Sequence, residues 1–138
     1  MNATNYAESA IGSTLFLGAA MPSITQWSIG LFTGAPSEDG TGGTEVAASG
    51  TGYARARIDP GANWGKRVDQ NASSQTVFYN AVNVQFNAAT ASWGTVTHFC
   101  LFDQSGNPWV IAPLTASKTI GAGSIPIFLA GELEVALG

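Results

Sequence analysis

Alternating apolar and polar positions recur along most of the chain and predict β-strands. In residues 82–86, for example, Val82, Val84 and Phe86 share a face, because successive side chains of a strand point to opposite sides. Turn-forming Gly, Pro, Asn and Ser residues separate such segments and predict antiparallel connections. This pattern predicts about eight strands, at residues 25–33, 52–58, 74–80, 82–86, 93–103, 109–114, 124–129 and 132–137.

The longest strand-like stretch, residues 93–103 (WGTVTHFCLFD), is apolar on both faces and is therefore predicted to be central. A turn at residues 104–107 predicts that it forms a hairpin with residues 109–114. Strict alternation would place Val96 on the same face as His98 and Cys100. Pro126 predicts an edge strand or a bulge near the C-terminus.

Residues 5–21 form the one stretch with helical spacing, which Pro22 would end. Asn5 is the predicted N-cap, with Glu8 three residues later in the manner of a capping box. Such a helix would either attach the protein to a partner or cover one end of a sheet. The predicted fold class is mainly all-β, an antiparallel β-sandwich or barrel with one N-terminal helix. We expect one domain over residues 1–138, with a helical segment at 1–22 and the sandwich at 23–138.

Charged residues make up only 10% of the 138 residues, against about a quarter in typical proteins. Two explanations stay open: a surface that contacts other protein, including copies of itself, or a compact β domain covered by Thr, Ser and Asn. The net charge of −4 argues against nucleic-acid binding, which needs clustered Lys and Arg. The apolar segment 11–21 is far shorter than the about 20 residues of a membrane span, so no membrane insertion or secretory signal is expected.

His98 and Cys100 are the single histidine and the single cysteine, two residues apart on the predicted central strand. A Cys–His pair can form a thiolate nucleophile, but apolar neighbours such as Phe102 keep a thiol inert. One cysteine excludes an internal disulfide, and with one histidine it excludes a zinc finger. The sequence also lacks a nucleophile elbow and a phosphate loop. We therefore predict a protein that is not an enzyme and that has no cofactor or metal site.

A cluster of basic and aromatic residues is the best candidate for a binding surface. Four of the five basic residues lie between residues 55 and 67, close to two aromatic residues. One interpretation is a binding surface that docks on an acidic partner or stacks on a sugar. The other is that the aliphatic stems of the arginines simply pack on an exposed sheet face. Alternation predicts that Tyr53, Arg55 and Arg57 share a strand face. Residues 64–67 are predicted to lie in a loop. The candidate interface residues are Tyr53, Arg55, Arg57, Trp64, Lys66, Arg67 and Trp109.

Several segments, in the same order and spacing, resemble a family of small bacteriophage proteins known as phage tail fibre proteins. The resemblance covers most of the chain and consists of strand and turn signatures, so it carries over no catalytic or ligand residue. Cys100 occupies a place where Gly or Ala is expected in such proteins, which further disfavours catalysis. The matching segments are residues 29–36 (IGLFTGAP), 43–46 (GTEV), 52–57 (GYARAR), 86–103 (FNAATASWGTVTHFCLFD) and 114–137 (LTASKTIGAGSIPIFLAGELEVAL).

The resemblance implies a non-enzymatic structural protein of a tailed phage, made in the bacterial cytoplasm of the host and located in the virion. It would be a tail fibre or tail-tip component, or a capsid decoration (cement) protein. Its expected partners are other virion proteins of capsid or tail and copies of itself in a homo-oligomer such as a trimer. Two other hypotheses stay open. One is a host-receptor or carbohydrate-binding module using Tyr53, Trp64 and Trp109, and the other is a small cysteine or glycan hydrolase.

Overall fold

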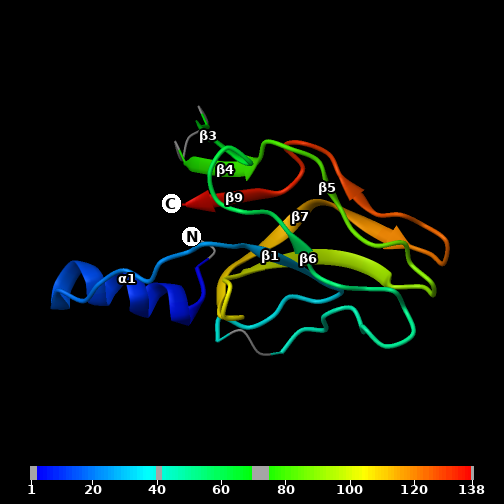
Figure 1. Ribbon diagram of the computed structural model, residues 1–138, viewed down its shortest axis with the longest axis horizontal. Helices are drawn as coiled ribbons and strands as arrows, with labels where there is room; N and C mark the ends of the chain where they lie inside the picture. The colour runs from blue at the N-terminus through cyan, green and yellow to red at the C-terminus, as the bar shows by residue number, and fades with distance from the viewer. Residues whose placement is uncertain (1–2, 40–41, 70–74, 138) are drawn as a thin grey trace.

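The computed structural model describes residues 3–39, 42–69 and 75–137 (Figure 1). Within these ranges the chain forms one helix and nine strands in three antiparallel sheets, and no closed barrel. The mainly β class with an N-terminal helix is therefore confirmed. The elements are α1 (Asn5–Leu17), β1 (Ser28–Phe32), β2 (Ala56–Arg57), β3 (Trp64–Val68), β4 (Thr76–Asn80), β5 (Val84–Gln85), β6 (Gly94–Phe102), β7 (Pro108–Ile120), β8 (Ile127–Phe128) and β9 (Glu134–Leu137).

The strand β6 lies inside the four-stranded sheet, whose order is β2-β1-β6-β7. Its residue Phe99 pairs with Leu31 of β1 and with Ala112 of β7. The predicted central strand and its hairpin are thus confirmed, although β7 runs on to Ile120 instead of ending at residue 114. On β1, Ile29 and Leu31 are fully buried on one face, as the alternation predicts.

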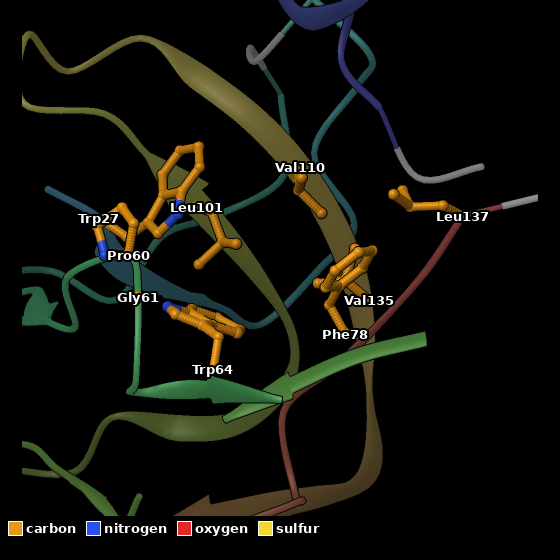
Figure 2. Close-up of a pocket in the computed structure, with 9 residues that line it drawn as sticks. All are labelled: Trp27, Pro60, Gly61, Trp64, Phe78, Leu101, Val110, Val135 and Leu137. Atoms are coloured by element: carbon orange, nitrogen blue, oxygen red, sulfur yellow. The ribbon is translucent and has the colours of Figure 1, made fainter. Parts of the chain in front are cut away.

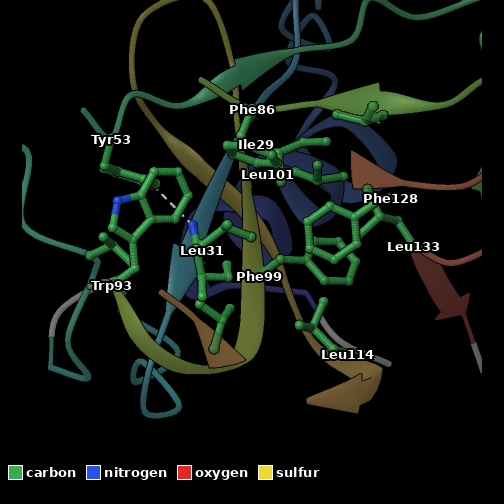
Figure 3. Packing of buried hydrophobic residues seen from close by; sticks show 14 of the residues in the cluster. Ile29, Leu31, Tyr53, Phe86, Trp93, Phe99, Leu101, Leu114, Phe128 and Leu133 are labelled. Atoms are coloured by element: carbon green, nitrogen blue, oxygen red, sulfur yellow. Dashed lines mark hydrogen bonds between the residues drawn. The ribbon is translucent and has the colours of Figure 1, made fainter. Parts of the chain in front are cut away.

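A register shift between Val96 and His98 interrupts the alternation of β6. Because of this shift, Val96 contributes to the main core together with Phe99 and Leu101, and Figure 3 shows the latter two. Cys100 packs in a separate cluster. The prediction that Val96 shares a face with Cys100 is therefore wrong. An added residue on one strand reverses the face of every side chain that follows it, and nothing in the sequence pattern marks that position.

The other sheets are three-stranded, β3-β4-β9, and two-stranded, β5-β8. In Figure 1 the three-stranded sheet lies above the layer that contains β1, β6 and β7. Residues 64–67, predicted as a loop, belong to the edge strand β3, and the strand expected at residues 52–58 is reduced to the two residues of β2. The start of the strand expected at residues 74–80 falls at Ser74, outside the described residues. β8 follows Pro126 and pairs only with β5, so the predicted edge strand is confirmed.

The helix α1 is attached to β7 at its first turn and then leaves the body of the protein (Figure 1). Its N-cap is Thr4, not Asn5, because the Thr4 hydroxyl accepts a hydrogen bond from the Ala7 N–H at 3.2 Å. The same hydroxyl donates to the Pro108 carbonyl at 2.5 Å, and the Thr4 N–H donates to the Trp109 carbonyl at 3.0 Å. The helix ends at Leu17, since Gly18 adopts the left-handed conformation (φ 70°) that terminates helices, so the predicted end before Pro22 is four residues too late.

Candidate functional site

The predicted basic patch is divided among separate ion pairs, the first of which is centred on Glu45. Arg55 donates two hydrogen bonds of 2.9 Å to the Glu45 carboxylate, and its guanidinium carbon lies 3.5 Å from the centre of the Phe102 ring. The Tyr53 hydroxyl donates to Glu45 Oε2 at 2.6 Å and accepts from the Leu31 N–H at 2.9 Å. Burial alone would raise the pKa of Glu45, but the hydrogen bonds from Arg55 and Tyr53 outweigh it and lower that pKa. Arg55 and Glu45 thus lie over the sheet face that carries Phe102, while Tyr53 reaches Glu45 from the main core.

The other basic candidates lie apart from that network. Arg57 forms a two-bond ion pair with Asp59 at 2.7 and 3.0 Å. Arg67 lies on β3, where it bonds both Asp69 and Glu134 at 2.8 Å, and Lys66 is exposed on the same strand. Because neighbouring carboxylates neutralise all three arginines, these residues do not form one positive surface. The expectation that Tyr53, Arg55 and Arg57 share a face is also wrong, because Tyr53 is buried in the core.

Trp109 is buried beneath the first turn of α1 and is not an exposed stacking platform. Its indole N–H donates to Asp103 Oδ2 at 2.9 Å, and its ring meets those of Tyr6 and Trp27 edge to face. Asp103 also accepts hydrogen bonds from the N–H groups of Ser105 and Asn107, both at 2.9 Å. The carboxylate of Asp103 thereby joins the β6–β7 turn to the residue that supports α1.

We predict that Asp103→Asn lowers the free energy of unfolding near neutral pH by about 1–3 kcal/mol. Every hydrogen-bond partner of this carboxylate is a donor. The N–H₂ group of an asparagine amide is also a donor, so it would face one of these N–H groups without forming a bond. Burial alone would raise the pKa of Asp103, but the donors of Trp109, Asn107 and Ser105 outweigh it and lower that pKa. The carboxylate's contribution is therefore complete above the ordinary aspartate pKa and disappears as the pH falls through the lower, folded value.

The measurement is urea denaturation from neutral pH down to acid. The difference in the free energy of unfolding between the parent and Asp103→Asn should disappear as the pH is lowered. The control is Glu38→Gln, a change at an exposed acid, whose free energy of unfolding should stay within about 0.5 kcal/mol of the parent at every pH. A gap that stays constant with pH would contradict this role of the carboxylate.

The two candidate catalytic side chains make no catalytic pair. His98 Nδ1 lies 2.9 Å from the Thr97 hydroxyl on its own strand. Cys100 is 1% exposed, and its thiol contacts the Leu101 carbonyl at 3.8 Å. Burial is the main cause that raises the pKa of Cys100 to about 12, so the thiolate is scarce at neutral pH.

A thiol reagent at about pH 8 should therefore leave folded Cys100 unmodified and label it once denaturant unfolds the chain. The control is a Leu129→Cys variant, whose added thiol replaces a half-exposed side chain and should react in the folded protein. Rapid labelling of Cys100 in the native parent protein would contradict the buried, inert thiol.

The far end of α1 presents an exposed apolar surface. The exposed fractions of Leu15, Phe16 and Leu17 are 70%, 83% and 81%. Ala7 is the only buried residue among those of the helix. A run of three consecutive large apolar residues spans more than half the circumference of a helix, at 100° per residue, and so cannot fit one stripe. That run is the signal in the sequence that could have predicted an exposed apolar helix end. We call Leu15, Phe16 and Leu17 the helix knob.

A second apolar feature is an open cleft of about 300 Å³ between the four-stranded and three-stranded sheets (Figure 2). Its walls carry no charge, and Trp64 is the one predicted interface residue that lines it. The indole N–H of Trp64 is buried and has no hydrogen-bond partner among the described residues. We call this cavity the inter-sheet cleft; it is lined by Trp27, Pro60, Gly61, Trp64, Phe78, Leu101, Val110, Val135 and Leu137.

A polar hollow of about 330 Å³ lies near the Arg57–Asp59 ion pair. Amide side chains from Asn63, Asn83 and Gln85 contribute to its lining. The described residues contain no group of three His, Cys, Asp or Glu side chains arranged to hold a metal ion. They also include no helix with the length and apolar character needed to cross a bilayer.

Comparison with known families places the chain among the phage tail fibre proteins, a class of virion structural components. The chain belongs to the family described as podophage GP4 fiber I protein gp80, whose model matches residues 2–136. The resemblance drawn from the strand and turn motifs is thereby confirmed, and the protein is a virion component. No curated protein matches the chain. The family is described as a fibre, so the capsid-decoration alternative gains no support from it.

Proposed function

We propose that this protein is a non-enzymatic module of a tail fibre that associates with copies of itself and docks on other tail proteins of the virion. The observation that carries the proposal is the helix knob, three large apolar side chains that are 70–83% exposed. Clusters of exposed apolar side chains mark interaction sites, because water contact with them is unfavourable and a partner removes it. Of the two roles considered for the N-terminal helix, attachment to a partner is the better supported.

The anchoring of α1 makes the knob a suitable attachment device. A helix of 13 residues is marginal by itself in water, so its stability depends on contacts at its base. Here those contacts are the cap and hydrogen bonds of Thr4 and the packing of Ala7 on Trp109. A helix fixed at one end and apolar at the other holds its contact residues away from the body, where a partner can surround them.

The absence of a catalytic role is part of this proposal. It is supported by the inert setting of Cys100 and by the contact of His98 with Thr97 in place of a nucleophile. A cysteine hydrolase would need a thiolate near neutral pH, and the raised pKa of Cys100 opposes its formation.

Chemical cross-linking of purified virions, followed by mass spectrometry, tests the location and the partners. We expect cross-links from Lys66 and Lys118, on the body, to tail proteins and to other copies of this chain. The number of copies per particle should match a fibre and lie far below that of the capsid protein. Cross-links to the major capsid protein alone, with hundreds of copies, would overturn the tail assignment in favour of capsid decoration.

The polar hollow supports carbohydrate or receptor binding as a second candidate function. Its amide and charged side chains can hydrogen-bond to hydroxyl groups, whereas the inter-sheet cleft, with its apolar walls, is poorly suited to a sugar. A glycan array with the parent, Arg57→Ala and Asn83→Ala would test it, with Asn87→Ala as a control at an exposed amide outside the hollow. No glycan signal for the parent protein would end this hypothesis. Trp109→Ala is unsuitable for this test, because the residue is buried and its loss would disturb the base of α1.

A further inference from the structure

We infer that the helix knob of one copy inserts into the inter-sheet cleft of a second copy. The inference rests on the proposed self-association and names the two surfaces that carry it. One chain presents both a protruding apolar end and an open apolar cavity, and neither is covered by the residues that the structure describes.

The shape of the knob requires a concave partner. Leu15, Phe16 and Leu17 point in three directions around the helix, 100° apart. A coiled coil of helices buries only a narrow stripe of each helix. A helix that is apolar on most sides is instead surrounded by its partner. Two knobs packed side by side therefore cover less apolar surface than one knob in a cavity.

The dimensions and the chemistry of the cleft match the knob. An apolar cavity of about 150 Å³ accepts one benzene ring, so the cleft of about 300 Å³ has room for the Phe16 ring and a leucine side chain. Residues 9–22 carry no charge, and neither does the lining of the cleft. Association would therefore remove apolar surface from water without the cost of burying an unpaired charge.

The knob cannot fill the cleft of its own chain. The last buried residue of α1 is Ala7, and Leu17 lies ten residues further along a straight helix, about 15 Å at 1.5 Å per residue. The bonds of Thr4 fix the base of that helix, and Figure 1 shows it directed away from the sheets. Val110 and Trp27 both line the cleft and pack against the helix base. The cleft thus adjoins the base of α1, while the knob reaches outward to another copy.

The test is disulfide trapping between two forms of the full chain, each carrying Cys100→Ala to remove the native thiol. One form also carries Ala19→Cys, two residues beyond the knob, and the other carries Leu137→Cys at the cleft, where the leucine is 37% exposed. The two forms differ in tag mass and are mixed under mild oxidation. We expect the mixed disulfide to be the main cross-linked product, several-fold above either homodimer. A matched control replaces Leu137→Cys with Leu129→Cys, a similar change at an exposed leucine outside the cleft, and should give little product.

Three outcomes would overturn the inference while leaving self-association intact. They are a dominant Ala19→Cys homodimer, a preference for the Leu129→Cys chain, and oligomers seen by light scattering without any mixed disulfide. A monomer in light scattering at high concentration would instead reject the proposed self-association itself. The introduced thiols replace exposed side chains, and circular dichroism of each chain verifies that it is folded.

Discussion

Replacing Phe99 by alanine should lower the free energy of unfolding by about 3–5 kcal/mol. Phe99 is 0% exposed and lies on β6, the strand that pairs with both β1 and β7. Removing its ring leaves a cavity bounded by residues of two sheets, and that cavity adds to the lost transfer free energy of the ring. Chemical denaturation of both proteins at low concentration measures the difference.

Phe16→Ala is the matched control, because it deletes the same ring from a residue that is 83% exposed. At low concentration it should change the free energy of unfolding by no more than about 0.5 kcal/mol. A marginal effect of Phe99→Ala, close to that of the control, would contradict the central position of β6 in the core.

Asn80→Ala should lower the free energy of unfolding by about 2–4 kcal/mol. Asn80 is 0% exposed, and its side-chain amide donates to the carbonyls of Val82 and Leu129 at 2.9 and 3.0 Å. Its side-chain carbonyl accepts from the N–H groups of Gly131 and Leu133 at 3.2 and 2.9 Å. Alanine would leave several main-chain groups without partners in the interior, where unpaired polar groups are costly. Thermal and urea unfolding measure the loss.

Asn83→Ala provides the comparison, since the Asn83 side chain accepts a single exposed hydrogen bond from the Ala130 N–H at 2.9 Å. Water can replace that bond, so a loss of no more than about 1 kcal/mol is expected. Equal losses for the two asparagines would show that Asn80 does not organise the chain between β8 and β9.

The alternation of apolar residues was sufficient to predict the central strand, because β6 is covered on both faces. Its core face carries Phe99, and its other face packs with Phe32 and the Arg55–Glu45 pair. Assigning individual side chains to faces failed at the shift between Val96 and His98, since a bulge depends on the partner strand. β3 was missed because it is an edge strand whose residues Lys66, Arg67 and Val68 are exposed, so it shows no periodic pattern.

The candidate site was less predictable than the fold. The sequence brings Arg55, Arg57 and Arg67 close together along the chain, but the fold pairs each with a different carboxylate. The inter-sheet cleft is built from segments that are far apart in sequence, which no local pattern reveals. The helix knob did leave a local signal, because three consecutive apolar residues exceed what one buried stripe can contain.

The mass of the protein in solution tests the central claim, that the end of α1 is an association surface. Light scattering of the parent at high micromolar concentration should give a mass that is a multiple of the 14.2 kDa of one chain. The triple variant Leu15→Gln, Phe16→Gln, Leu17→Gln keeps helix-forming residues but removes the apolar surface, and should give the mass of one chain. A parent protein that stays monomeric, or a triple variant that associates as strongly as the parent, would contradict the account.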